Sequence, residues 1–209
     1  AYDFETCSQV FKDDVNFQTN ITPLPGEPDL PNAAILYMNG RQHRDYRTLV
    51  QPSFVPARAM WWIENWATTV IDRLIDAIAE RGSADLNVDL CAPIPLLTIT
   101  GSFGISVEEA LEVRAAVTSD GQDTTTLARL LLPIIAARRD APADDLITVL
   151  VQAELTDEDG VTHTLSDIEV LSFGLLLLAA GSGTTWKQMG LTLWALLTHR
   201  EVLDAVRAD

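Results

Sequence analysis

Small and hydroxyl-bearing residues interrupt a long apolar segment in the C-terminal part of the sequence. Residues 179–185 read Ala-Ala-Gly-Ser-Gly-Thr-Thr. Glycine inside a helix costs about 1 kcal/mol relative to alanine, and serine or threonine hydroxyls can bond to the helix backbone and loosen it. The pattern therefore indicates that another group approaches the backbone closely here. Thr184 is the candidate for chemistry, because a hydroxyl both donates and accepts a hydrogen bond. The alternative is a local bond to a carbonyl one turn earlier.

A second cluster combines an imidazole with several guanidinium groups. Residues 40–47 read Gly-Arg-Gln-His-Arg-Asp-Tyr-Arg. His43 and Arg47 lie four residues apart, so they share one face of a helix and offer an imidazole and a forked guanidinium to one carboxylate or phosphate. With Arg41, Arg44 and Arg58, they form a local basic concentration in an acidic chain. The alternative is a solvated helix face that pairs with nearby acids.

One long helix is predicted to carry the first cluster. Ser166 and Glu169 form a capping-box pattern, and the sequence from Ser166 to His199 contains no proline. A helix over residues 166–198 would be on the order of 50 Å long. Residues 170–186 carry no charge, but this run falls just short of the roughly 18–20 residues of a spanning helix. We therefore predict a buried core helix and no membrane span.

The rest of the sequence predicts a mainly α protein with minor β structure. Apolar residues recur at four-residue steps over 57–80, which predicts an amphipathic helix there. They are Trp62, Trp66, Val70, Leu74 and Ile78. Other helices are predicted over residues 2–12, 41–50, 93–103, 107–118, 127–139, 144–154 and 201–208. Polar and apolar residues alternate over 85–90, which predicts a short strand, and residues 157–160 predict the turn of a small hairpin. Irregular segments are expected in the proline-rich loop 23–31 and the polar break 119–126.

The charge and cysteine content of the sequence limit the kinds of molecule that this protein is expected to bind. The 209 residues carry a formal net charge of −16, which argues against nucleic acid and anionic membrane surfaces as main partners. The two cysteines, Cys7 and Cys91, lie far apart and show no metal-ligand spacing. Without a disulfide framework or a signal peptide, a cytoplasmic location is expected.

Several motifs, in the right order, resemble the cytochrome P450 family of the soluble, bacterial type. Residues 39–54 resemble the family's helix C segment, including its His-x-x-x-Arg. Residues 180–185 resemble the central motif of helix I, which usually reads Ala-Gly-x-Glu/Asp-Thr-Thr. Residues 144–147 and 165–169 match helix H and the start of helix I, and residues 199–203 resemble helix J.

The resemblance implies one P450-like helical domain over residues 1–209. Helix B and the B–C loop would occupy 1–38, helix C 40–50, helices D to H 57–155, helix I 166–198 and helix J 200–209. The family's Glu-x-x-Arg helix and cysteine-bearing haem loop have no counterpart in this sequence, so the cysteine ligand is expected beyond Asp209. Cys7 and Cys91 are poor replacements for it.

The activity implied by the resemblance is that of a haem-thiolate monooxygenase. Such an enzyme inserts one oxygen atom from O2 into an apolar small molecule, using haem b and electrons from a ferredoxin or flavodoxin-type donor. The alternative is a helical binding protein of P450 descent that does not turn over.

The resemblance also assigns candidate residues. His43 and Arg47 would bind the haem propionates, and the other arginines would face the electron donor. Cofactor contacts at the helix centre would come from Ala180, Gly181 and Thr184. Thr184 would also help to deliver protons, and substrate contacts would come from Leu177, Ala180, Ile35 and Leu36.

Two departures from the family pattern affect these assignments. Gly183 stands where the family's acid precedes the threonine, so proton delivery would have to use Ser182 or ordered water. The segment 103–138 is also shorter than the family's helices F and G with their loop, through a deletion or through missing residues. That region normally roofs the substrate pocket.

Overall fold

A long helix runs through the molecule and organises the other elements around it. In the computed structural model, which describes residues 3–13, 15–17, 35–118, 123–156 and 160–208, this helix is α9, Asp167–Thr198. Ser166 is its N-cap: the Ser166 hydroxyl accepts from the Glu169 amide, and the Glu169 carboxylate accepts from the Ser166 amide at 2.8 Å. The predicted helix over 166–198 and its capping box are thereby confirmed.

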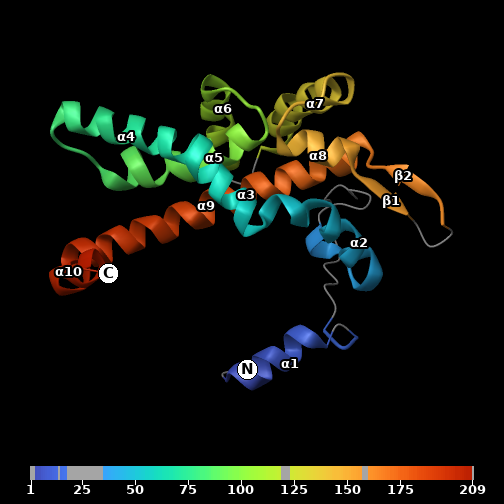
Figure 1. Cartoon of the computed structure of the whole chain (residues 1–209), viewed down its shortest axis with the longest axis horizontal. Coiled ribbons are helices and arrows are strands. Elements are labelled where there is room, and N and C mark those ends of the chain that lie inside the picture. The colour runs from blue at the N-terminus through green and yellow to red at the C-terminus, as the bar shows by residue number, and fades with distance from the viewer. Residues whose placement is uncertain (1–2, 14, 18–34, 119–122, 157–159, 209) are drawn as a thin grey trace.

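Four helices pack on one side of α9, and together they contain the main core (Figure 1). They are α5 (Pro93–Ser102), α6 (Val107–Thr118), α7 (Thr124–Asp140) and α8 (Leu146–Gln152). Phe103, Leu131, Ile147 and Leu178 are fully buried within this core. The N-terminal half of α9 is therefore a core element of the fold.

Four of the remaining helices precede this core in the sequence: α1 (Phe4–Lys12), α2 (Gly40–Val50), α3 (Pro56–Trp62) and α4 (Thr68–Arg81). The fifth, α10 (Arg200–Ala208), follows α9. A π-helical turn, Ile63–Ala67, joins α3 to α4, so the predicted helix over 57–80 is continuous but contains a π segment. Short 3₁₀ turns occupy Ile35–Tyr37 and Gln51–Phe54.

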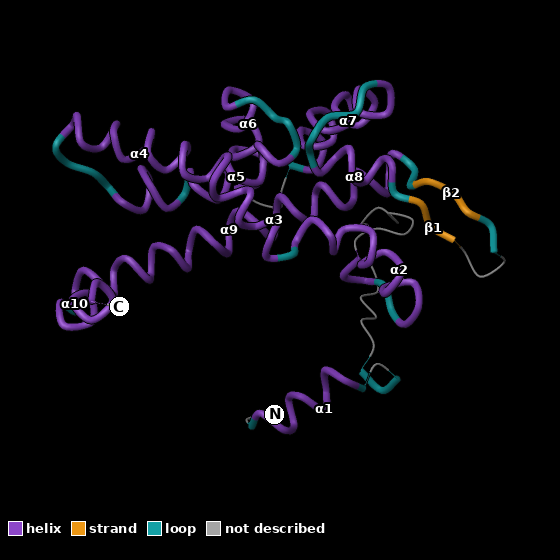
Figure 2. The backbone as a smooth tube through the Cα atoms, viewed as in Figure 1, coloured by secondary structure: helices purple, strands orange, loops and turns teal. Residues whose placement is uncertain are grey.

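The β structure of the described residues is one small hairpin, drawn as two strands in Figure 2. Strand β1 (Glu154–Thr156) pairs antiparallel with β2 (Thr162–Thr164), with Leu155 opposite His163. The predicted hairpin is confirmed, although the residues at its tip, 157–159, lie outside the described part. So do the proline-rich loop 23–31 and residues 119–122 of the predicted polar break.

The predicted strand over 85–90 is wrong. Residues Asn87–Cys91 form a π-helical turn that leads into α5. The Asp85 carboxylate accepts hydrogen bonds from the amides of Asn87 and Val88, at 3.0 and 3.3 Å. Asp85 therefore acts as a helix cap, and a run of six residues that alternates in polarity is too short to distinguish a strand from a capped helical turn.

Length and composition alone would allow α9 to cross a membrane, since its most apolar window has a mean hydropathy of 1.5. The core helix of a soluble protein passes the same test. Val170, Phe173 and Leu178 of α9 are at most 4% exposed within the fold, which accords with a core helix.

Gly101 lets α5 approach the π segment between α3 and α4. A Cβ at this position would overlap the indole ring of Trp66, whose Nε1 donates to the Leu97 carbonyl at 3.2 Å. Overpacking of this kind typically costs about 1–3 kcal/mol. We therefore expect Gly101→Ala to lower the free energy of unfolding by about that amount, as measured by chemical denaturation.

Gly183 provides the matched control for Gly101. A Cβ at Gly183 meets no atom within 4 Å, so Gly183→Ala should raise the free energy of unfolding by about 1 kcal/mol through helix propensity alone. Equal effects of the two substitutions would contradict the packing described for Gly101.

Candidate functional site

The small residues of α9 serve two different faces of the helix. On the inner face, a Cβ at Gly174 would lie 3.1 Å from Leu131 of α7, and one at Gly181 would lie 3.5 Å from Ile99 of α5. Ser182 is buried on the same side, and its hydroxyl donates to the Leu178 carbonyl at 2.6 Å. Gly181 was predicted to make room for a cofactor, but in the structure it packs against α5.

The outer face of α9 carries the candidate catalytic hydroxyl. Ala180 and Thr184 are exposed one turn apart, and Leu177 is half-buried beside them. The Thr184 hydroxyl donates to the Ala180 carbonyl at 2.6 Å, which is the local bond foreseen as the alternative. Its oxygen can still accept a hydrogen bond from another group, so the local bond fixes the hydroxyl's direction and leaves an acceptor on the outer face.

Two cavities meet at Thr184, which lines both of them. The first, of about 390 Å³, lies between α5, α6 and α9 and is bordered by Gly183. The second, of about 620 Å³, runs along α9 past Gln188 and Leu193. The hydroxyl of Thr184 therefore lies where a bound molecule and a chain of waters could meet.

On α2, the predicted anion-binding pair shares one side of the helix. His43 is half-buried and Arg47 is exposed, and neither forms an ion pair with another residue that the structure describes. The predicted face-sharing follows from the helical conformation of Gly40–Val50. Both side chains therefore remain available to an anion that approaches this side.

The wider basic cluster is less uniform than predicted. Arg41 pairs with Asp45 at 3.2 Å along α2. Arg58 pairs with Asp144 at 2.6 Å and lies over the ring of Trp61, 4.3 Å from its centroid. Arg58 therefore joins α3 to the loop before α8, and its charge is already compensated within the fold.

Tyr46 connects α2 directly to the N-terminus of α9. Its hydroxyl donates to the Glu169 carboxylate, and its ring stacks on Phe173 with centroids 6.1 Å apart. Burial raises the pKa of Tyr46 well above its ordinary value, and the hydrogen bond to Glu169 adds to that effect. Burial would raise the pKa of Glu169, but hydrogen bonds from Tyr46 and Ser166 outweigh it and the pKa is lowered. No local pattern in the sequence indicates this contact, which fixes the helix that carries His43 and Arg47.

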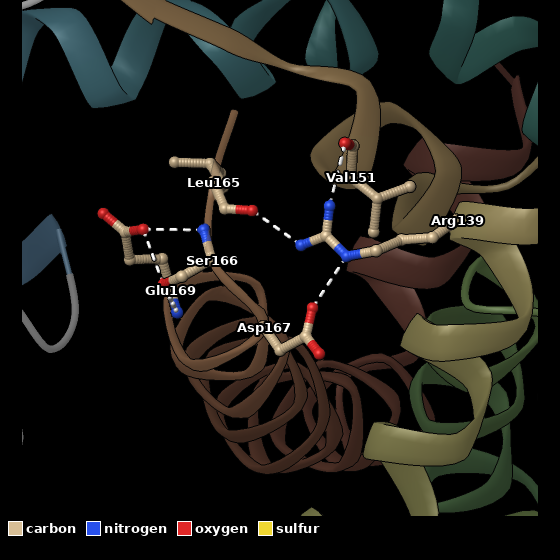
Figure 3. A network of polar contacts seen from close by, with 6 residues as sticks. All are labelled: Arg139, Val151, Leu165, Ser166, Asp167 and Glu169. Atoms are coloured by element: carbon tan, nitrogen blue, oxygen red, sulfur yellow. Dashed lines mark hydrogen bonds and ion pairs between the residues drawn. The ribbon is translucent and has the colours of Figure 1, made fainter. Parts of the chain in front are cut away.

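A second network holds the same end of α9, as Figure 3 shows. The Arg139 guanidinium donates to the Asp167 carboxylate at 2.7 Å, to the Leu165 carbonyl at 2.6 Å and to the Val151 carbonyl at 3.5 Å. One side chain from α7 thus joins the end of α8, the exit of the hairpin and the first turn of α9. The start of α9 is held from two directions, by Arg139 and by Tyr46.

The bond between Tyr46 and Glu169 predicts a specific dependence of stability on pH. Because the folded-state pKa of Glu169 is lowered from 4.5, its contribution is present above that pH and is lost as the pH falls through the lowered pKa. Tyr46→Phe should reduce the free energy of unfolding at neutral pH by about 1.5–3 kcal/mol, as for hydrogen bonds to charged groups. It should also weaken the acid-side loss of stability, as measured by denaturation between neutral and acid pH.

Tyr37→Phe is the control, because Tyr37 is 47% exposed. A Tyr46→Phe variant with the same acid-side profile as this control would show that Tyr46 does not set the pKa of Glu169.

Two predicted substrate contacts lie away from Thr184. Ile35 packs against the main core, and Leu36 is 55% exposed in the short 3₁₀ turn before α2. Neither lines the two cavities at Thr184. Because Ile35 and Leu36 are far from α9 in the sequence, the sequence alone does not show whether they line these cavities.

The structure does not favour thiolate chemistry at Cys91. Cys91 is fully buried, and burial raises the pKa of its thiol. Cys7 lies in α1 and is half-buried. Within the described part of the chain, no three His, Cys, Asp or Glu side chains are grouped as metal ligands would be.

The chain resembles known proteins both in sequence and in structure. No protein-family model matches the sequence. A steroid C26-monooxygenase of Mycolicibacterium smegmatis is 30% identical over 201 aligned positions that cover 88% of this chain and 48% of that protein. The cytochrome P450 monooxygenase PikC of Streptomyces venezuelae is 30% identical over 205 positions that cover 93% of this chain and 48% of PikC.

Solved structures show the same likeness. The LnmA cytochrome P450 hydroxylase of Streptomyces atroolivaceus superposes with a TM-score of 0.73 at 28% identity, over 84% of this chain and 47% of LnmA. Substrate-free CYP109E1 of Bacillus megaterium has the same fold, with a TM-score of 0.80 at 21% identity, over 100% of this chain and 58% of that one. The chain spans about half the length of the curated relatives it matches. On this shared sequence and fold, the chain belongs to the cytochrome P450 family.

Proposed function

We propose that this chain is part of a haem-thiolate monooxygenase that inserts one oxygen atom from O2 into an apolar small molecule. The observation that carries the proposal is the position of Thr184, which is exposed on the outer face of the central helix where two cavities meet. The P450 relatives are monooxygenases or hydroxylases, and the family implies a haem. We take this to be haem b, with its cysteine ligand in a segment beyond Asp209.

The residues present fit such a group. Ala180 offers only a methyl group on the exposed face of α9, and Thr184 offers a hydroxyl oxygen, so a flat apolar ring system can lie against this helix. His43 and Arg47 offer two donors on one side of α2, as carboxylate side groups require. When bound, the haem supplies the oxygen activation, while the protein provides orientation, electrostatics and protons.

The chain's own residues then have separate tasks. His43 and Arg47 hold the propionates, and Tyr46 and Glu169 keep α2 in place. Thr184 would accept a hydrogen bond from a water on the outer face and so hold a proton donor beside the bound haem. The Ser182 hydroxyl donates to the Leu178 carbonyl, so it is a poor substitute for the family's acid. The proton route therefore uses waters in the cavity of about 390 Å³ beside Gly183, which has room for several.

An electron donor of the ferredoxin or flavodoxin type would approach the basic side of α2. Because Arg41 and Arg58 are paired with acids, Arg44 is the better candidate for contact with an acidic partner. Its side chain is exposed. We place the protein in the cytoplasm on its net charge of −16 and on the likeness to bacterial P450s.

The second candidate is a P450-derived binding protein without turnover, which the glycine at position 183 favours. Reaction of the full-length protein under isotopically labelled O2, with a redox system and an apolar substrate, separates the two. One labelled oxygen atom in the product is expected of the monooxygenase. Substrate binding without any labelled product would support the binding protein.

A further inference from the structure

The side chain of Asn87 joins the π-helical turn Asn87–Cys91 to the second half of α9. Its Oδ1 accepts a hydrogen bond from Nε1 of Trp186 at 2.7 Å. The indole N–H can only donate, so the amide oxygen of Asn87 is the atom that meets it. One turn further along α9, a Cβ at Gly190 would lie 3.1 Å from the same oxygen. Glycine at position 190 therefore leaves room for the close approach of Asn87 to α9.

The turn that carries Asn87 is itself fixed to α4. The Asp85 carboxylate accepts from the Asn87 amide at 3.0 Å, and the Asp89 carboxylate accepts from the Asp85 amide at 2.9 Å. Asp89 also pairs with Arg81 of α4 at 2.9 Å. Asn87 is thus presented to α9 by a turn whose own position is set by contacts within the preceding segment.

α9 needs such support because it leaves the core where its sequence favours a helix least. Among the residues that the structure describes, no residue of α9 after Ser182 is buried. Gly181 and Gly183 lie at this boundary, and glycine disfavours a helix interior relative to alanine. Thr184 follows directly, so its position depends on what holds the next turn of the helix, where Trp186 lies.

Both cavities at Thr184 have one wall from α9 and another from the segment that contains the 87–91 turn. Trp186 and Ala92 line the first cavity. Met189 and Leu90 line the second. A change in the distance between this turn and α9 would therefore change both cavities at the point where Thr184 borders them.

We propose that Asn87 is a positioning residue: through Trp186 it holds the second half of α9 and so keeps the Thr184 hydroxyl at the junction of the two cavities. Asn87 is not among the described residues that line either cavity, so it acts through Trp186 and not by touching a substrate. This inference rests on the proposed function only for its effect on the reaction, because the tether itself is a property of the chain.

Hydrogen exchange at the indole N–H of Trp186 tests the tether without any turnover. The full-length protein is labelled at its tryptophan indole nitrogens and measured by NMR, reduced and under carbon monoxide so that bound haem is diamagnetic. Trp186→Phe identifies the signal by its loss. Asn87→Leu removes the acceptor but keeps a side chain of similar size, and should speed exchange about 3–10-fold, as for a neutral hydrogen bond.

Two further variants make this measurement specific. Asn87→Asp retains an acceptor oxygen and should keep exchange slow. Gly190→Ala leaves both bonding partners in place but crowds Oδ1 of Asn87, and should speed exchange in the same direction as Asn87→Leu. If Asn87→Leu does not fold, Gly190→Ala still decides the outcome.

The effect on the reaction is measured as kcat and KM for the apolar substrate that yields labelled product from labelled O2. Asn87→Leu and Trp186→Phe should each lower kcat about 3–10-fold and change KM less than about twofold, because the contact positions a group that acts during the reaction. With Thr184→Ala already present, the same substitutions should have little further effect. Trp194→Phe is the matched control, because this indole on the same helix is 64% exposed, and it should change neither exchange nor kcat.

Exchange at Trp186 that neither Asn87→Leu nor Gly190→Ala alters would overturn the proposal. So would losses of kcat that are equal with and without the Thr184 hydroxyl, since the tether would then not act through that group. Slow exchange that depends on Asn87, in a protein that forms no oxygenated product, would support the tether and contradict the proposed monooxygenase function.

Discussion

Replacing Thr184 with alanine should lower the rate of product formation by about a hundredfold, within the usual contribution of a positioned proton donor or acceptor. The hydroxyl of Thr184 is the exposed polar group on α9 at the junction of the two cavities. Alanine keeps the helix and the cavity but removes the oxygen that accepts a hydrogen bond there. Substrate affinity should change by less than about twofold, because the lost interaction acts during the reaction.

Two further variants make this prediction specific. Thr184→Ser restores a hydroxyl and should recover most of the activity. Thr185→Ala removes the neighbouring hydroxyl, which lines only the second cavity, and should have a small effect. Equal losses in Thr184→Ala and Thr185→Ala, measured by product formed per electron supplied, would mean that Thr184 has no special role in proton transfer.

Loss of either His43 or Arg47 on α2 should weaken haem retention. Removing a charge-assisted hydrogen bond costs about 1.5–3 kcal/mol, so Arg47→Ala should weaken haem binding about 10–100-fold. His43→Ala should have a smaller effect, because an imidazole offers fewer hydrogen-bond donors to a carboxylate than the forked guanidinium of Arg47. The measurement is the haem content that remains after incubation with a haem-scavenging protein.

Arg44→Ala is the matched control on the same helix. Arg44 is exposed and lies next to His43, so it points to another side of α2. If Arg44→Ala released haem as readily as Arg47→Ala, the effect would come from overall charge and the proposed propionate contacts would be wrong.

Local signals accounted for the elements that position the site. Ser166 and Glu169 predicted the start of α9, because both partners of a capping box lie within one turn of sequence. The alternation over 85–90 failed as a strand signal, because Asp85 caps a helical turn there. Sequence patterns therefore predicted the structure correctly where a helix end is set by neighbouring residues and a long apolar run follows it.

The other features of the fold and the site depend on contacts between segments that are distant in the sequence. Tyr46 and Glu169 are 123 residues apart, and Arg58 and Asp144 are 86 apart, so no local pattern reveals either pair. The sequence also could not predict which neighbour Gly181 faces, because that depends on which side of α9 contacts Ile99. The site's motif was recognisable, but the assignment of its residues to the inner or outer face required the structure.

The central claim is that this chain belongs to a protein that holds haem through a thiolate beneath the outer face of α9. The most direct test is the absorption spectrum of the full-length protein after reduction and addition of carbon monoxide. A Soret band at the position of thiolate-ligated haem is the result we predict. A protein purified with haem supplied during expression that shows no haem absorbance, or only a band at the position of imidazole-ligated haem, would contradict the claim.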